Sequence, residues 1–184
     1  YLIRKGIPTH FVKRLSPTEE LVKKCEMIRL EFVTRNIVAG HFASRFGLKE
    51  GTPLAQPVEE TFYKSDELDD PFANESDAIA IQACTAKEYQ QCWDLARRCN
   101  VLLTALFAKA GMKLVDFKLE FGKLADGTLV LADEFSPDNC RLWDRETNAH
   151  LDKDVFRKGL ADITTTYDEV YARLQKAVME ENDD

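Results

Sequence analysis

This 184-residue sequence contains no long apolar run and no excess of basic charge. Without a run of about 18 apolar residues it offers no candidate for a membrane-spanning helix, and its start lacks the charged-then-apolar order of a signal peptide. The formal net charge of −7 argues against duplex nucleic acid, because phosphate-backbone binding needs a basic face. A small anionic substrate needs only a local cluster of Arg and Lys. We therefore predict a cytoplasmic protein with neither a membrane nor a nucleic acid as partner.

Cysteine pairs at the C-x-x-C spacing of zinc sites are also missing. The cysteines are odd in number and widely spaced, at Cys25, Cys84, Cys92, Cys99 and Cys140. Disulfides and a zinc site are therefore not expected, and we predict reduced thiols in the core.

Glycine and proline occur at ordinary levels in a sequence that is 45% hydrophobic and 31% charged. This composition is typical of one globular domain that buries a core. The acidic tail from Glu180 to Asp184 is predicted to be a solvated end. The sequence opens at Tyr1 without a methionine, and its first residues are typical of the end of a helix. We therefore expect it to be part of a longer protein.

Short β-like runs are predicted in the first third of the sequence, at residues 11–12, 21–22 and 28–33. Residues 47–77 read as loop-rich, with breakers at Gly51-Thr52-Pro53 and Asp70-Pro71. A long helix is predicted to follow, because Thr85-x-x-Glu88 is a capping box and Gly111 is a helix stop. Its core face repeats at helical spacing and comprises Tyr89, Cys92, Trp93, Ala96, Cys99, Leu103, Leu106, Phe107 and Ala110.

A hairpin over residues 113–134 and a last helix from about Asp152 complete the predicted elements. The last helix should bury one face, made of Phe156, Leu160, Ile163, Tyr167, Val170 and Leu174. Strands and helices are segregated more than alternated, which favours an α+β fold over a parallel doubly wound sheet.

The hairpin concentrates charge on one face. Side chains alternate along a strand, so Val115, Phe117, Leu119 and Phe121 share a face. The opposite face carries Asp116, Lys118 and Glu120. A two-residue turn at Asp126-Gly127 would pair Ala125 with Thr128 and place Glu120 opposite Asp133.

Two carboxylates in that position repel each other unless a cation lies between them. Mg²⁺ suits such a pair, because it prefers one or two carboxylates together with phosphate oxygens and water. The alternative is a solvent-exposed polar face on which Lys118 neutralises Glu120 and Asp133. Arg141, in the turn-rich loop that follows, is a candidate clamp for a carboxylate or phosphate, since its fork matches both.

The motifs D-F-K-L-E-F-G (116–122) and L-A-D-E-F-S-P-D-x-C-R-L-W-D (131–144) resemble the signature pair of SAICAR synthetases. Shorter matches occur in the same order as in that family, over nearly the whole sequence. They are Gly6-Ile-Pro-Thr9, Leu21-Val-Lys-Lys24, Glu31-x-x-x-Arg35-Asn36, Lys64-x-Asp66 and Asp70-Pro71-x-x-Asn74-Glu75.

The resemblance implies a two-lobed α+β fold, similar to kinases and ATP-grasp enzymes, with ATP and Mg²⁺ as cofactors. It divides the sequence into residues 1–26, a remainder of the N-terminal ATP-binding lobe, and residues 27–184, the lobe that binds substrate and Mg²⁺. Most of the N-terminal lobe, with its glycine- and lysine-rich phosphate loop, is expected to lie outside this sequence. A homodimer is the expectation from the family.

The resemblance also implies residue roles. The segment Lys24 to Met27, with Glu26, resembles the adenine-binding connection, and Glu120 and Asp133 resemble the Mg²⁺-linked carboxylates. The implied substrate clamps are Arg35, Lys118 and Arg141, with Asp116 orienting Lys118 or the substrate's amino group. Lys64 and Asp70 would lie in a loop near the incoming aspartate.

Two positions after Ala39-Gly40 depart from the family, because His41 and Ser44 stand where many relatives carry a serine and often a lysine. Where many relatives carry a phosphate-contacting serine, this sequence has His41, which either donates to phosphate from a helix N-terminus or is a packing or surface histidine. His10 and His150 are predicted to be structural.

Three functions follow from these observations. The first is the family's ligase reaction, in which ATP drives the condensation of carboxyaminoimidazole ribonucleotide with L-aspartate through an acyl phosphate. The second is a small-molecule kinase on a related fold, which would use the same carboxylate pair. The third is a non-enzymatic binding module. The segments around Arg35 and Arg141 favour the ligase.

Overall fold

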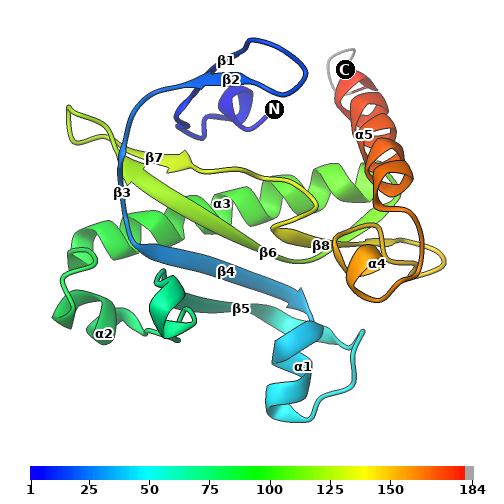
Figure 1. The fold of residues 1–184 in the computed structure, drawn as a ribbon, viewed down its shortest axis with the longest axis horizontal. Coiled ribbons are helices and arrows are strands. Elements are labelled where there is room, and N and C mark those ends of the chain that lie inside the picture. The colour runs from blue at the N-terminus through cyan, green and yellow to red at the C-terminus, as the bar shows by residue number, and fades with distance from the viewer. Residues whose placement is uncertain (181–184) are drawn as a thin grey trace. The chain divides into compact units, whose positions relative to one another are not determined.

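The computed structural model of this protein describes residues 1–180, and Figure 1 traces the order of its elements along the chain. The strands are β1 (Phe11–Arg14), β2 (Glu20–Val22), β3 (Glu26–Met27), β4 (Leu30–Ile37), β5 (Pro53–Tyr63), β6 (Met112–Lys123), β7 (Leu129–Ala132) and β8 (Cys140–Asp144). The helices are η1 (Ile3–Lys5), α1 (Gly40–Phe46), η2 (Asp66–Leu68), α2 (Glu75–Ala80), α3 (Ala86–Lys109), α4 (Asp154–Arg157) and α5 (Ile163–Glu180). Of the predicted solvated tail, all but Glu180 lies outside the described residues.

The chain divides into two compact units, which we describe separately. Unit 1 consists of Tyr1–Val33, Glu60–Cys99 and Leu119–Glu134. Unit 2 consists of Thr34–Glu59, Asn100–Lys118 and Phe135–Asp184. Elements β4, β5, α3 and β6 contribute residues to both units. The division predicted after residue 26 concerns the lobes of the family and stays a prediction.

Among residues 1–180 the strands form two sheets. The smaller one pairs β1 with β2 antiparallel. The larger has the order β3-β6-β4-β5, and β7 and β8 each pair with β6. The pairs that β6 forms with β3, β7 and β8 are antiparallel. This arrangement confirms the predicted α+β class. None of the helices in the described part has the length and apolar character that crossing a membrane requires.

Helix α3 forms as its sequence predicts. Thr85 donates from its backbone N and its hydroxyl to the Glu88 carboxylate, and the Glu88 backbone N donates back to the Thr85 hydroxyl at 3.2 Å. The helix ends at Lys109, and Gly111 adopts the left-handed φ of 71° that favours glycine at a helix end. Every residue of the predicted core face is buried.

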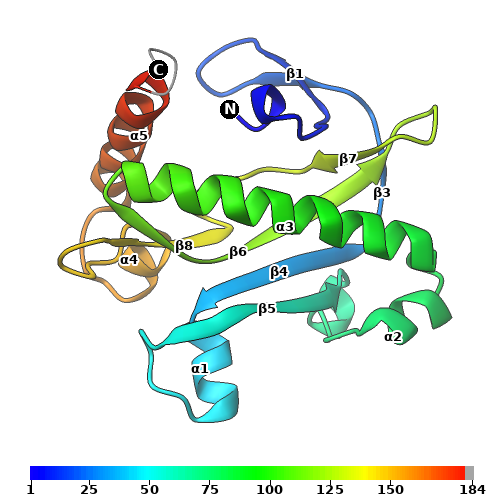
Figure 2. The same cartoon turned by 180° about the vertical axis from the view of Figure 1, so that it is seen from behind.

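Aromatic packing joins α3 to the strands of unit 1. The Phe32 ring lies 5.8 Å from Tyr89 of α3, 5.2 Å from Trp93 of α3 and 5.2 Å from Phe121 of β6. Figure 2 shows α3 running along β6 on one face of the sheet. The apolar face predicted for β6 is confirmed, because Val115, Phe117, Leu119 and Phe121 are all buried.

The expectation of loop over residues 47–77 is wrong, because β5 is an eleven-residue strand within that range. The breakers Gly51-Thr52-Pro53 and Asp70-Pro71 prompted the loop assignment, and Pro53 and Pro57 both lie within β5. The strand order places β5 at the end of the β3-β6-β4-β5 row, and an edge strand tolerates proline because one row of its N–H groups needs no partner.

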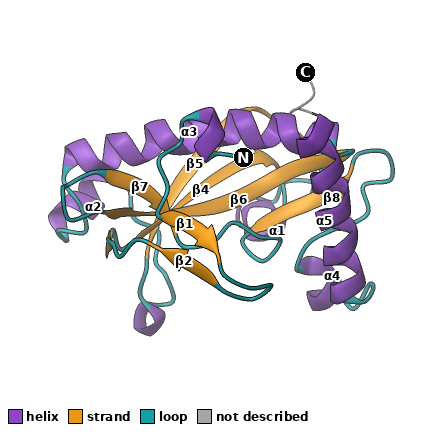
Figure 3. Ribbon diagram, turned by 90° about the horizontal axis from the view of Figure 1, so that it is seen from above, coloured by secondary structure: helices purple, strands orange, loops and turns teal. Residues whose placement is uncertain are grey.

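The single last helix predicted from Asp152 is also wrong. The chain forms the short helix α4, turns at Gly159 with a φ of 62°, and starts α5 at Ile163. The Asp162 carboxylate caps α5 by accepting from the Thr165 backbone N and hydroxyl. Phe156 is therefore 71% exposed rather than in the core, and Leu160 is exposed too. Figure 3 shows α4 and α5 as separate helices of unit 2.

The predicted register of the β6–β7 hairpin is wrong by one residue. Glu120 lies opposite Ala132, not Asp133. The Gly127 backbone N donates to the Leu124 carbonyl, and Leu124 N donates to the Thr128 carbonyl. Of Asp126 and Gly127, only Gly127 has a positive φ, of 84°, whereas the predicted two-residue type I′ turn needs one at both positions. The turn is instead a three-residue loop with the glycine in a bulge, which shifts the pairing by one.

Candidate functional site

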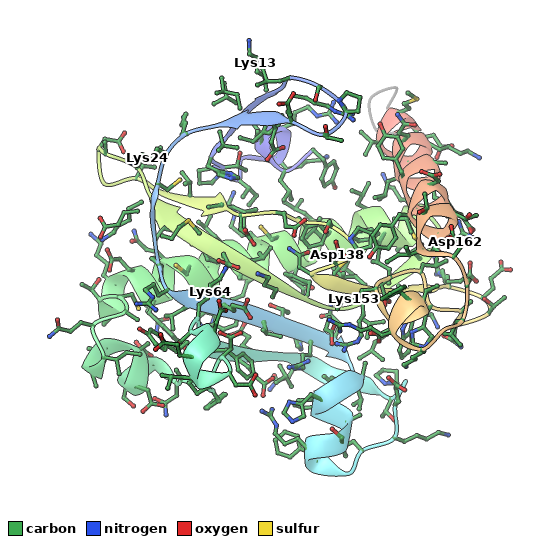
Figure 4. All side chains as sticks on the ribbon, viewed as in Figure 1. Lys13, Lys24, Lys64, Asp138, Lys153 and Asp162 are labelled. Atoms are coloured by element: carbon green, nitrogen blue, oxygen red, sulfur yellow. The ribbon has the colours of Figure 1, made fainter. Side chains whose placement is uncertain are left out.

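Unit 1 contains a cavity of about 410 Å³ that brings together most of the residues predicted to bind ATP and metal. Its lining comprises His10, Val22, Lys23, Lys24, Cys25, Met27, Ile28, Arg29, Lys64, Glu120 and Asp133. Figure 4 labels Lys24, in the segment before β3, and Lys64, in the loop after β5. Among the predicted ATP-binding residues, Glu26 is in β3 but is not part of this lining.

The wall formed by Lys24, Cys25 and Met27 depends on a glycine. Met27 pairs with Gly122 of β6. A Cβ atom at Gly122 would lie 2.6 Å from the Cys25 Cβ, which is too close, and 3.2 Å from the Met27 sulfur, which would have to shift. Gly122, the last residue of the D-F-K-L-E-F-G motif, therefore lets this segment approach β6 and border the cavity.

Glu120 is the most buried charged group of the cavity, with 3% of its surface exposed. The Lys64 Nζ lies 2.7 Å from each of its two carboxylate oxygens. The Lys64 side chain is 44% exposed, so it reaches the carboxylate from the solvent side. A cation thus already sits in front of Glu120.

Asp133 reaches the same cavity in spite of the register shift. It follows the last residue of β7 and has a φ of 56°, a left-handed conformation that is uncommon for residues other than glycine. Because of this backbone conformation, the Asp133 side chain no longer follows the alternation of side chains between the two faces of β7. Glu120 and Asp133 therefore line one cavity through a backbone turn, not through the predicted cross-strand pairing.

His10, predicted from the sequence to be structural, borders the cavity as well. Its Nδ1 is buried and has no hydrogen-bond partner among residues 1–180. Its backbone N donates to Leu131 at 2.9 Å and its carbonyl accepts from Lys23 at 2.7 Å. These hydrogen bonds hold the backbone of His10 next to that of Lys23. Lys23 also lines the cavity, and it too was not predicted as a site residue.

Unit 2 contains a cluster of buried charges that we call the arginine cluster: Arg35, Asp116, Arg141 and Asp154. One oxygen of Asp116 accepts from Arg35 Nη1 at 3.2 Å and from Arg141 Nη1 at 2.9 Å. Arg141 Nε donates to Asp154 at 2.9 Å. Arg35, Asp116 and Asp154 are each less than a tenth exposed. The structure thus joins three predicted residues and adds Asp154.

A bulge in β6 makes the contact between Asp116 and Arg141 possible. Met112 and Leu114 pair with Asp144 and Leu142 of β8, a register that would place Asp116 opposite Cys140. The register shifts between Leu114 and Asp116, so that Asp116 faces Arg141. Opposed residues on neighbouring strands share a face, which allows the ion pair.

The electrostatics of the arginine cluster favour its charged form. Burial lowers the pKa of Arg141, but the charge of Asp116 and the bond to Asp154 outweigh this and raise it. Burial acts to raise the pKa of Asp154, yet the hydrogen bond and charge of Arg141 bring it below its ordinary value. For the neighbouring Lys153, burial and the charge of Arg141 both lower the pKa.

Gly40, at the start of α1, lies directly against Arg141. A Cβ atom at this position would be 2.7 Å from the guanidinium carbon of Arg141, and Gly40 has a left-handed φ of 52°. Both the space and the backbone conformation therefore require glycine here. His41, the next residue, is exposed in the first turn of α1.

The remaining predicted residues are not part of the cavity lining. Asp70 accepts at 2.7 Å from the backbone N of Ser65 and so closes the loop after β5. Lys118 is half-buried, and its backbone N donates to the Asn139 carbonyl at 2.9 Å.

Another group of possible metal ligands, His150, Asp152 and Asp154, lies in unit 2. Its carboxylates already have protein partners. Asp152 accepts from the backbone N of Leu142 and of Asp154, each at 2.8 Å, and Asp154 accepts from Arg141. We assign no ion to this group.

A family model described as SAICAR synthetase matches residues 1–174. The chain belongs to the SAICAR synthetase family. The predicted resemblance is thus confirmed, and with it the class of enzyme, a ligase of purine biosynthesis.

Individual SAICAR synthetases agree with this membership. The phosphoribosylaminoimidazole-succinocarboxamide synthase of Limosilactobacillus fermentum is 67% identical over 182 residues, which cover 98% of this chain and 76% of the relative. The crystal structure of the synthase from Ehrlichia chaffeensis is 47% identical, with a TM-score of 0.92, over 95% of this chain and 75% of that one. A SAICAR synthetase (Type-2) in complex with ADP is 44% identical, with a TM-score of 0.91, over 94% and 74%. About a quarter of each relative therefore lies outside the match.

Proposed function

We propose that the protein condenses carboxyaminoimidazole ribonucleotide with L-aspartate, using ATP and Mg²⁺, and releases SAICAR, ADP and phosphate. The observation that carries this proposal is the cavity of unit 1, where Lys24, Met27, Glu120 and Asp133 converge from three separate segments. The ADP complex of the relative that is 44% identical supports a nucleotide in a protein of this family.

The cavity suits a nucleotide. Its lining combines the apolar Val22, Met27 and Ile28 with the basic Lys23, Lys24 and Arg29. An adenine ring needs apolar walls, and phosphates need cations or donors. We propose that Lys24, Glu26 and Met27 hold the adenine end of ATP and that Lys23 and Arg29 face its phosphates.

The carboxylates suit a magnesium ion. Glu120 and Asp133 are oxygen ligands of the kind Mg²⁺ prefers, and the Lys64 ammonium in front of Glu120 shows that a cation is stable there. We propose that Glu120 and Asp133 hold the ion. When bound, it supplies charge neutralisation for the phosphate oxygens.

The arginine cluster suits the nucleotide substrate. Arg35 and Arg141 offer guanidinium forks for its phosphate and carboxylate, and Asp116 fixes both side chains before substrate arrives. We propose Lys118 as a further clamp, with His41 as a phosphate donor and with Lys64 and Asp70 near the incoming aspartate.

The chemistry requires activation, because a carboxylate does not form an amide unaided in water. A substrate carboxylate oxygen attacks the γ-phosphorus of ATP, and the bond to ADP breaks. The aspartate amine then attacks the acyl carbon, phosphate leaves and the amine loses a proton. The protein positions these groups and neutralises their charge. No cysteine serves as nucleophile in this scheme, since burial raises the pKa of Cys92 and Cys140 and keeps their thiols protonated. A cytoplasmic location and a homodimer remain predictions.

The test is an assay with ATP, Mg²⁺, carboxyaminoimidazole ribonucleotide and aspartate that follows ADP and amide together, then omits each component. We expect both products only with all four present. Glu120→Gln and Asp133→Asn should each lower turnover about a thousandfold or more, because the metal-linked charge neutralisation is lost. Asp168→Asn, which changes an exposed carboxylate of α5 outside both candidate sites, is the matched control and should retain activity. ADP release that continues without aspartate would instead indicate a small-molecule kinase, and nucleotide binding without turnover would indicate a binding module.

A further inference from the structure

The ion pair between Lys64 and Glu120 is asymmetric. Glu120 is almost fully buried at 3% exposure, whereas the Lys64 side chain is 44% exposed. The Nζ lies at 2.7 Å from both oxygens, so it occupies the position in front of the carboxylate where a metal ion would bind. A charged carboxylate that is buried to this degree needs a cation beside it.

The ion pair between Lys64 and Glu120 forms where two carboxylate side chains, Glu120 and Asp133, line the same cavity. Asp133 lines the same cavity, because its left-handed φ of 56° turns it there from the end of β7. Two carboxylates on one cavity repel each other, which favours cation binding between them. The lysine supplies one positive charge, and a divalent ion would supply two.

We propose that Lys64 is the resident counter-ion of Glu120, and that a divalent metal ion displaces it from this carboxylate when the site is loaded. The inference rests on the proposed metal role of Glu120 and adds a competitor from within the chain. Metal affinity is then set by an exchange of cations, and the ammonium that leaves Glu120 becomes available to an anionic ligand.

The exchange needs only a side-chain movement. Two hydrogen bonds to Arg29 hold the backbone of Lys64. The Lys64 N donates to the Arg29 carbonyl at 3.1 Å, and the Lys64 carbonyl accepts from Arg29 Nη2 at 3.3 Å. The Ser65–Asp70 bond closes the loop that follows. The four-carbon stem of lysine can swing its ammonium into solvent while this backbone stays in place.

Manganese titration tests the proposal directly. Free Mn²⁺ is measured by electron paramagnetic resonance for the full chain and for Lys64→Met, Lys64→Arg, Lys24→Met and Glu120→Gln. We expect Lys64→Met to bind Mn²⁺ about tenfold more tightly, because the competing hydrogen bonds to a charged group are gone. Lys64→Arg should bind more weakly than the wild type, since its fork grips both carboxylate oxygens.

Lys24→Met separates competition from general electrostatics. It removes the same charge from the same cavity lining, but it does not remove the bond to Glu120. Its Mn²⁺ affinity should stay within about twofold of the wild type, as for other exposed charges.

The proposal is overturned if Lys64→Met binds Mn²⁺ no more tightly than Lys24→Met, while Glu120→Gln loses binding. In that outcome the metal role of Glu120 stands and only the displacement fails. If Glu120→Gln binds as the wild type does, or no variant binds at all, the proposed metal role itself fails.

Discussion

Glu120 and Asp116 lie four residues apart on β6, and the protein neutralises them in opposite ways. Glu120, in unit 1, pairs with one lysine that is 44% exposed and borders an open cavity. Asp116, in unit 2, accepts from two arginines whose side chains are 9% and 15% exposed. Glu120 therefore has an exposed counter-ion that can move away, whereas the counter-ions of Asp116 are largely buried and held in place.

The difference shows what each type of pair is suited to. A lysine is a compact point charge on a flexible stem, so its pairing breaks easily when a stronger cation arrives. Two arginines on one carboxylate form a rigid network whose members lose little further freedom when substrate binds. We infer that the cavity of unit 1 is built for exchange and that the arginine cluster is built for positioning.

The largest expected effect comes from removing the central carboxylate of the arginine cluster. Asp116→Asn should lower the free energy of unfolding by about 3–5 kcal/mol, because buried guanidinium groups lose their shared counter-charge. Glu120→Gln should cost only about 1 kcal/mol, since its exposed partner can turn to solvent. Urea unfolding of both variants measures the difference. Equal losses would contradict the distinction between built-in and exchangeable pairs.

A smaller effect is expected where the arginine cluster meets α1. Gly40→Ala should cost about 1–2 kcal/mol for the left-handed φ of 52°, and its Cβ should push the Arg141 guanidinium aside. We expect KM for the nucleotide substrate to rise about tenfold, as for the loss of one charge-assisted hydrogen bond.

Gly47→Ala is the matched control for this change. Gly47 closes α1 with a left-handed φ of 62°, and a Cβ there would meet nothing within 4 Å. It should lose a similar free energy of unfolding while KM stays unchanged. A rise in KM in both variants would mean that strain in α1, not contact with Arg141, is responsible.

The smallest effect concerns an ion pair at the surface of unit 2. Asp144 accepts from the Thr147 backbone N and hydroxyl and from Arg173 Nη1, and these bonds lower the pKa of its carboxyl. A lowered pKa in the folded state means that unfolding takes up a proton. The stabilisation is therefore complete above the ordinary carboxyl pKa of about 4 and fades as the pH falls below it.

Asp144→Asn should accordingly be less stable than the wild type at pH 7, and this deficit should be smaller at pH 3, where the unfolded chain but not the folded protein has taken up most of the proton. Urea midpoints at both pH values measure this. Asp168→Asn, on the exposed face of α5, should match the wild type at pH 7. A deficit of Asp144→Asn that is as large at pH 3 as at pH 7 would show that packing, not charge, is involved.

Local periodicity allowed much of the fold to be predicted. The core face of α3, its capping box and its glycine stop depend on residues within a few positions of one another, and the structure confirms all three. The alternation of β6 is equally local, so its buried apolar face was predictable. Motif resemblance supplied the site residues, several of which meet in one cavity.

Register and long-range pairing were not predictable. A glycine bulge in the β6–β7 turn moved Glu120 away from its expected partner, and a second bulge in β6 brought Asp116 opposite Arg141. Neither bulge has a reliable local signature, because the extra residue is accommodated by the whole strand pair. Lys64 reaches Glu120 across 56 positions, and Arg35 reaches Asp116 across 81.

The sequence by itself thus determined the family, the α+β class and the chemical types in the site, because these depend on composition, spacing and motif. The tertiary structure alone decided which charge neutralises which carboxylate. That choice depends on strand register, on the left-handed backbone of Asp133 and Gly40, and on burial, which sets the cost of leaving a charge without a partner.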